Sequence, residues 1–304
     1  MAFLNALPGA VAEGLIWGLM AIGVYISYKI LDIADLTVDG SIATGACTCV
    51  VMMAAGMPVW LSVLAAIIAG ILAGIVTGLL HTLLGVPSIL AGILTQLMLY
   101  SVNITILGGK SMLAIDFSRK EDLWLNANNS LMAVIVGILI VAILIVVLWL
   151  FFYTEVGLTL KSTGDNPDMS RAQGVNVQFN KVVGLGISNG IVALAGALLA
   201  QYKGTANLND GRGAIVIGLA AIFIGLSISL KIKPNFVVSL IGVVSGGVIY
   251  YIIYNLVIML GLKTEYLKML SALIVAIFLG VPYLKSTYFA KKIPIEEEGG
   301  GADA

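Results

Sequence analysis

The sequence predicts an all-α protein that crosses a membrane about nine times, and three observations lead to this fold class. Hydrophobic residues make up 60% of the 304 residues and charged residues 11%, against about 45–50% and about 25% in soluble domains. The stretch 131–152 carries no charge over about 22 residues, which is long enough for a bilayer-spanning helix. Gly, Pro and charged residues divide the rest of the chain into similar apolar segments. Such a chain cannot cover itself with polar surface, so we expect it to be a polytopic membrane protein.

Hydropathy and turn-forming residues place the predicted spans, and a count between eight and ten fits the pattern. They lie near 9–29, 37–56, 59–83, 87–107, 131–153, 182–202, 213–229, 236–258 and 267–284. We expect one transmembrane domain over 1–284, with 154–181 as a cytoplasmic loop and 285–304 as a polar cytoplasmic tail. A slight excess of Lys and Arg on that side predicts an outside N-terminus and an outside segment 108–130.

Two parts of the chain show faint internal similarity. Pro58 and Gly85 are separated by as many residues as Pro234 and Gly261. Each pair falls in a set of three predicted spans, and two further spans separate the sets. Corresponding spans are therefore five apart and run in opposite directions, which predicts the inverted repeat that is typical of transporters.

Composition and isolated motifs exclude several functions. Basic and acidic residues number 16 each, so no basic excess indicates nucleic acid. Cys47 and Cys49 face different directions on a helix, which excludes a disulfide or a metal site formed by this pair. His81 is the single histidine, and we interpret it as a satisfied side chain at a helix end.

The fragment Gly109-Lys110-Ser111 resembles the end of a phosphate-binding loop. The motif requires a glycine where Ile104 stands, and it requires a strand before it and a helix after it. We therefore predict a polar turn. No catalytic set can be assembled from one His and a few loop acids, so we expect neither enzymatic activity nor a cofactor or metal in this chain.

The segment 32–41 brings three aspartates close to a predicted span. Carboxylates near the membrane are costly unless they face water, a partner or a pathway. One interpretation is a broken helix that lines a translocation path, with Gly40 permitting the break and Thr37 and Ser41 capping the next helix. The other is a cytoplasmic turn with Asp39 as the helix N-cap. The sequence leaves both open.

The segment 157–176 contains capping signals for a short helix between two spans. Asp165 or Asn166 can cap a helix that begins at Pro167, and Gly174 can end it about two turns later. Met169 and Arg171 would then be available to contact a soluble partner. A short loop helix that docks nothing is the alternative.

Three motifs carry a resemblance to a known family. These are GLTLKSTGDNPDMSRAQGVNV at 157–177, DIADLTVDGSIATGA at 32–46 and GLLHTLLGVPSILAGILTQ at 78–96. They resemble the permeases of ATP-binding cassette (ABC) importers for branched-chain amino acids, ribose and related solutes. The resemblance covers roughly 14–282 and is closest to the branch associated with tryptophan or tyrosine uptake.

The resemblance implies a permease in a bacterial plasma membrane that works with several partners. These would be a second permease copy, two cytoplasmic ATP-binding subunits that bind the ATP, and an extracellular solute-binding protein. The helix in 154–181 would be the coupling helix that docks into the ATPase. An amino acid, and among amino acids an aromatic one, is the first choice of substrate; a sugar or nucleoside is the second. An ion-coupled secondary transporter is the alternative class.

Two sets of site residues follow. Gly164, Asn166, Arg171, Gly174 and Asn176 match the family pattern of the loop, and Asp35, Leu36 and Ser41 match the earlier signature, from which Asp39 departs. The expected coupling residues are Gly164, Asp165, Asn166, Pro167, Met169, Ser170, Arg171, Gly174 and Asn176. The expected pathway residues are Asp35, Thr37, Asp39, Ser41 and Asn209.

Overall fold

The computed structural model describes residues 2–115, 123–229 and 235–259, and single positions at 269, 272, 273, 276 and 280. Its helices in chain order are α1 (Ala2–Tyr25), η1 (Ile26–Ile30), α2 (Thr37–Ala54), α3 (Val59–Thr82), α4 (Ser88–Ile106), η3 (Ala127–Asn129), α5 (Ser130–Phe152), α6 (Glu155–Asp165), α7 (Pro167–Ala172), α8 (Val177–Lys203), α9 (Ala214–Ser229) and α10 (Phe236–Met259). The strands β1 (Met112–Ala114) and β2 (Thr205–Asn207) pair antiparallel, with Leu113 opposite Ala206.

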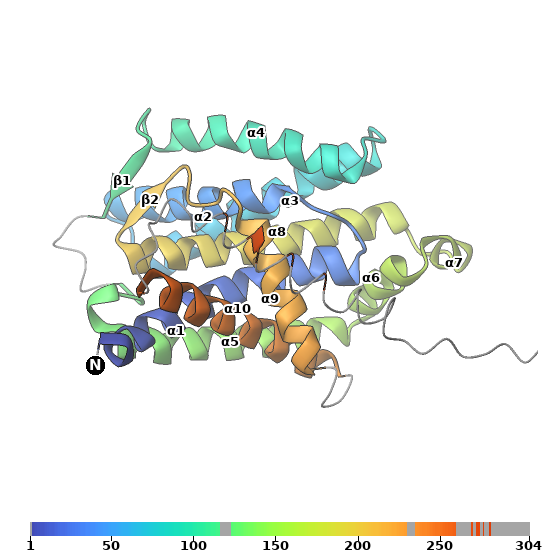
Figure 1. Ribbon diagram of the computed structural model, residues 1–304. Coiled ribbons are helices and arrows are strands. Elements are labelled where there is room, and N and C mark those ends of the chain that lie inside the picture. The colour runs from blue at the N-terminus through green and yellow to red at the C-terminus, as the bar shows by residue number, and fades with distance from the viewer. Residues whose placement is uncertain are drawn as a thin grey trace, which may run out of the picture.

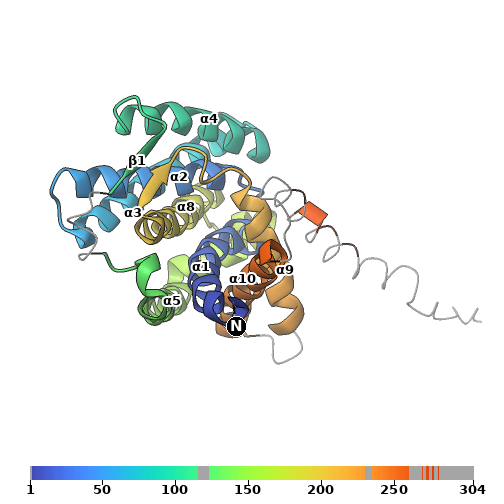
Figure 2. The same ribbon diagram turned by 60° about the vertical axis from the view of Figure 1, so that its left-hand side comes forward.

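The long helices form a bundle in which their axes run in roughly the same direction, as Figure 1 shows. The short helices α6 and α7 lie at one end of the bundle, and the strands β1 and β2 lie at the other. The predicted cytoplasmic loop and the predicted outside segment therefore occupy opposite ends. Figure 2 shows α1 and α8 in the middle of the bundle, with α4 and α5 at opposite edges.

The predicted spans agree with the helices in the described part of the chain. Seven helices there are long and apolar enough to cross a membrane, and α9 is a shorter apolar helix. The predicted span 267–284 and the tail 285–304 lie outside the continuously described residues. Three features were not predicted: η1 is a π-helix, α6 precedes the loop helix, and β1 pairs with β2.

Burial divides the helices into central and peripheral ones. In the most apolar window of α8, 78% of the residues are buried, against 28% in α5. Side chains of α5 such as Leu131, Leu139 and Ile143 are more than half exposed. Lipid solvates such side chains, so α5 faces the bilayer while α8 forms the core.

Small residues let α3 approach α8 closely. A Cβ atom added to Gly70 would meet the carbonyl group of Asn189, and one added to Gly74 would meet that of Leu185. Helix association in lipid depends on this kind of close packing, because lipid supplies no hydrophobic drive between helices. These glycines therefore serve helix packing.

The inverted repeat stays a prediction, with one supporting observation. The helices α2 and α9 begin the two proposed copies and have 18 and 16 residues. Each is followed by a helix of 24 residues, α3 and α10. The third helix of the second copy falls in 267–284, where the structure describes only scattered positions.

Candidate functional site

The loop between α5 and α8 folds into two capped helices. The Thr154 hydroxyl accepts from the Gly157 N–H at 3.3 Å and caps α6. The Asn166 side chain accepts from the Met169 N–H at 3.0 Å and caps α7, with Pro167 as the first helical residue. Gly174 follows with φ +84°, a conformation that favours glycine. The prediction of a helix that begins at Pro167 is confirmed.

Five of the nine expected coupling residues hold this loop in shape. Asn166 and Gly174 define the ends of α7. The buried Ser170 donates to the Ser162 hydroxyl of α6 at 3.2 Å. The Asn176 side chain accepts from the Phe179 N–H at 3.1 Å and caps α8. Gly164 faces the carbonyl group of Ile30 so closely that a Cβ atom would collide with it.

The other four residues are exposed. Met169 is 60% exposed, and the Arg171 side chain is 66% exposed, with an ion pair to Asp168 at 3.4 Å. Asp165 and Pro167 are exposed as well. An exposed pair of this kind interacts weakly, so Arg171 remains able to contact another protein. Figure 1 shows α7 at the end of the bundle. The helix thus exposes an apolar side chain, Met169, and a basic one, Arg171.

The connection 31–36 before α2 is partly buried, with Leu31, Ile33 and Asp35 inside, and it is fixed by hydrogen bonds. The Asp35 carboxylate accepts from the Thr37 N–H at 2.9 Å and from the Asn189 amide at 2.6 Å. The Ser41 hydroxyl donates to the Asn189 carbonyl oxygen at 2.6 Å. The Thr37 hydroxyl lies 2.7 Å from that of Thr77. Burial raises the pKa of Asp35, and the hydrogen bonds from Thr37 and Asn189 act in the opposite direction.

Several details expected for 32–41 are wrong. The chain breaks at Asp32, with φ 55°, whereas Gly40 lies inside α2 and packs against Gln96 of α4. Asp35, not Thr37, Ser41 or Asp39, caps the first turn of α2, because a carboxylate two residues before an N–H forms a local turn readily.

The Asp39 side chain of α2 forms hydrogen bonds with the start of α9. Its carboxylate accepts from the Gly213 N–H at 2.9 Å and from the Ile215 N–H at 3.0 Å. These donors are among the N–H groups that a helix start leaves without a helical partner, so Asp39 caps α9. The backbone of Gly211 also touches the carbonyl group of Asp39. The N-termini of α2 and α9 therefore meet.

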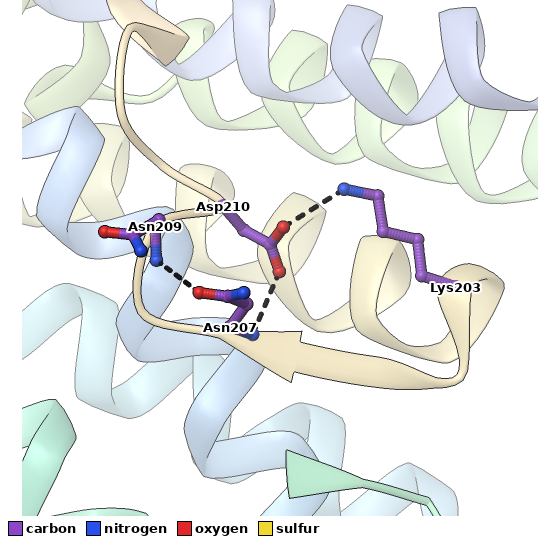
Figure 3. A network of polar contacts seen from close by, with 4 residues as sticks. All are labelled: Lys203, Asn207, Asn209 and Asp210. Atoms are coloured by element: carbon purple, nitrogen blue, oxygen red, sulfur yellow. Dashed lines mark hydrogen bonds and ion pairs between the residues drawn. The ribbon is translucent and has the colours of Figure 1, made fainter. Parts of the chain in front are cut away.

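The connection 204–213 is held by its own polar groups, which Figure 3 shows. The Asp210 carboxylate accepts from the Asn207 N–H at 3.0 Å and pairs with the Lys203 ammonium at 3.1 Å. The Asn207 side chain accepts from the Asn209 N–H at 2.9 Å. These contacts are local. The connection is also held by distant ones, namely the pairing of β2 with β1 and the bond from the Gly213 N–H to the Asp39 carboxylate.

The structure separates the five expected pathway residues into three groups. Asp35, Thr37 and Ser41 are at most 2% exposed and lie in the closed network described above. Asp39 lines a cavity of about 430 Å³ between α2, α4 and the connection 204–213. Asn209 lines a different cavity, beside α1, α9 and α10.

Sequence reasoning missed several polar residues within spans. Asn189, Gln96 and Asn103 lie in α8 and α4, and Glu13 lies in α1. A polar residue inside an apolar span is itself a signal of function, so these residues could have been found. Arg212 was missed because it lies in a loop.

The residues and motifs that the sequence indicated to be structural occupy structural positions. His81 lies 2.8 Å from the Val86 carbonyl oxygen and 3.4 Å from the Lys181 ammonium. Cys47 and Cys49 are buried and free. Gly108 and Gly109 form a turn that leads into β1, so the fragment there is no phosphate-binding loop. In the described part of the chain, no three His, Cys, Asp or Glu side chains gather where a metal could bind.

Comparison with known proteins gives two similar relatives over nearly the whole chain. A tyrosine transport system permease protein of Clostridioides difficile (strain R20291) is 34% identical over 276 residues, which cover 91% of each chain. An uncharacterized protein of Rickettsia prowazekii (strain Madrid E) is 32% identical over 288 residues, 91% of this chain and 97% of that one.

A more distant relative is the Autoinducer 2 import system permease protein LsrC of Salmonella typhimurium (strain LT2). It is 26% identical over 209 residues, 68% of this chain and 58% of that one. No solved structure matches the chain. The family model described as branched-chain amino acid transport system, permease component, matches residues 9–279. The chain therefore belongs to this family of ABC-type permeases and is a multi-pass protein of the bacterial plasma membrane.

Proposed function

We propose that this chain is the membrane-spanning subunit of an ATP-driven importer for an amino acid, with an aromatic amino acid as first choice. It works as two permease copies with two cytoplasmic ATP-binding subunits, which receive α7, and with an extracellular solute-binding protein. The family and the name of the Clostridioides difficile relative support this assignment. A sugar or nucleoside is the second choice of substrate.

The observation that carries the proposal is the shape of the loop between α5 and α8. Two caps, a buried serine and a close glycine contact fix α6 and α7 against the bundle. The same fold leaves Met169 at 60% exposure at the tip. A rigid helix with one exposed apolar anchor is the kind of element that enters a groove on a partner.

The experiment uses the complete complex in proteoliposomes and measures ATP-dependent uptake of labelled L-tyrosine and L-leucine. Met169→Glu should reduce ATPase association and uptake by about tenfold or more, because a charge enters an apolar contact. Met169→Leu should preserve both. Met112→Glu places the same charge on an exposed residue of β1 at the opposite end, so we expect it to leave ATPase association unchanged.

Two results would reject the proposal. One is uptake by Met169→Glu that equals wild type. The other is wild-type uptake that needs no ATP and follows an ion gradient, which would identify a secondary transporter.

A further inference from the structure

The cavity of about 430 Å³ beside Asp39 has the size and polarity of a small-molecule site. It lies between α2, α4 and the connection 204–213, and small-molecule sites measure roughly 300–1,000 Å³. Its wall combines charged, polar and apolar residues, among them Asp39, Ala43, Gln96, Tyr100, Asn103 and Arg212.

The cavity wall carries one charge of each sign. The Asp39 carboxylate is fixed there by the hydrogen bonds from Gly213 and Ile215. Those bonds and the one from the Ala214 N–H to the Gly211 carbonyl oxygen occupy the first three N–H groups at the start of α9, so these groups are not available to bind an anion. Arg212 supplies the positive charge, and within the described residues its guanidinium has no ion pair.

Asn103 gives an independent indication of a ligand. The residue is 1% exposed, and its side-chain oxygen has no hydrogen-bond donor in the described structure. A buried carboxamide oxygen without a partner destabilises a protein. A ligand that donates hydrogen bonds would satisfy it.

We propose that this cavity binds the backbone groups of the transported amino acid, an inference that rests on the proposed function. The guanidinium of Arg212 receives the carboxylate, because Arg matches carboxylate geometry. The Asn103 oxygen accepts from the ammonium, which the negative charge of Asp39 also attracts. Tyr100 offers its ring to the substrate side chain. The site selects for a zwitterion and tolerates different side chains.

The test measures binding to the permease–ATPase complex in nanodiscs without the solute-binding protein. Ligand-observed NMR titrations give the Kd of L-tyrosine, of tyramine, which lacks the carboxylate, and of 3-(4-hydroxyphenyl)propionate, which lacks the ammonium. Wild type should bind L-tyrosine at least about tenfold more tightly than either analogue. Arg212→Gln should weaken L-tyrosine about tenfold and leave tyramine unchanged. Asn103→Leu should weaken L-tyrosine and leave the propionate unchanged.

Two controls separate binding from folding. Lys110→Gln removes an exposed cation outside the cavity and should change no Kd. Asn103→Leu should not lower the unfolding temperature, because it removes a buried oxygen without a partner.

The outcomes distinguish the two proposals. If wild-type proteoliposomes take up L-tyrosine or L-leucine with ATP but Arg212→Gln and Asn103→Leu keep the wild-type Kd pattern, this inference alone fails. If wild type takes up neither amino acid, the proposed function fails and this inference falls with it.

Discussion

The connections 31–36 and 204–213 both precede a helix, but different kinds of contact stabilise them. The first leads into α2 and the second into α9, and the N-termini of these two helices meet. Half of the residues in the first are buried, and Asn189 of α8 holds the buried Asp35 from 154 positions away. The second has a smaller share of buried residues. Asp210 holds it through neighbours in sequence, and β1 and Asp39 hold it through distant contacts.

The difference indicates which connection can move. Opening 31–36 would break the hydrogen bonds of buried polar groups such as the Asp35 carboxylate and leave these groups without partners, which is costly. Within 204–213, the partly exposed contact of Asp210 with Lys203 is one that water can replace, and Arg212 lines two cavities. We therefore expect 31–36 to remain fixed while 204–213 changes shape during transport.

Asn189→Leu should break the first connection and give the largest effect. It removes one of the two hydrogen bonds that the Asp35 carboxylate accepts and leaves the Ser41 hydroxyl without its acceptor, at positions at most 2% exposed. We expect a loss of about 3 kcal/mol or more, measured as thermal or denaturant unfolding in detergent. Asp35→Asn keeps an acceptor for Thr37 and should cost much less. Equal losses in the two variants would contradict this view of the network.

Asp39→Ala should have an intermediate effect, since it removes the link between the two helix starts. Two N–H groups of α9 lose their acceptor, which typically costs about 1–2 kcal/mol. Hydrogen exchange should show the loss in the first turn of α9 and not in α2. Asp39→Asn keeps a capping oxygen and serves as the control. Faster exchange spread evenly over both helices would argue against a cap.

Asp210→Ala should act only on the second connection. Asn207 loses an acceptor and Lys203 loses its ion-pair partner, and we expect a cost of about 1 kcal/mol. The unfolding temperature should fall slightly while proteolysis within 204–213 becomes faster. If instead the variant unfolds as readily as Asn189→Leu, the two connections do not differ as described.

Lys203→Gln should have the smallest effect. The side chains of Lys203 and Asp210 are 38% and 15% exposed, and a pair of this kind contributes about 0.2–1 kcal/mol. Salt should reduce the difference from wild type further. A double-mutant cycle with Asp210→Ala measures the coupling. A coupling well above this range, unchanged by salt, would show a more buried pair than the one described.

The sequence predicted those parts of the fold that depend on local signals. Hydropathy located the long helices because every span needs about 20 apolar residues in succession. Asn166, Pro167 and Gly174 predicted α7 because each acts on its own helix end. The π-helical turn η1 carries no such signal, and it remained unpredicted.

The candidate site depends on contacts between distant residues, and sequence reasoning recovered it only in part. Asp35 and Asp39 were selected correctly as residues of interest, but nothing nearby indicated that their partners are Asn189 and Gly213. Asp39 lies 174 positions from Gly213, and only the packing of α2 against α8 and α9 brings the two together. Local propensity contains no information on such pairs.

The close contact between Gly164 and Ile30 has a mechanical consequence. Backbone meets backbone there, with no flexible side chain between α6 and the π-helical end of the first span. Closely packed backbone is nearly incompressible. We therefore expect a movement of α6 towards Ile30 to displace η1 by a similar amount. Any side chain at position 164 would collide with the Ile30 carbonyl group and force α6 and η1 apart. We therefore expect the loop between α5 and α8 and the end of the first span to move as one rigid unit.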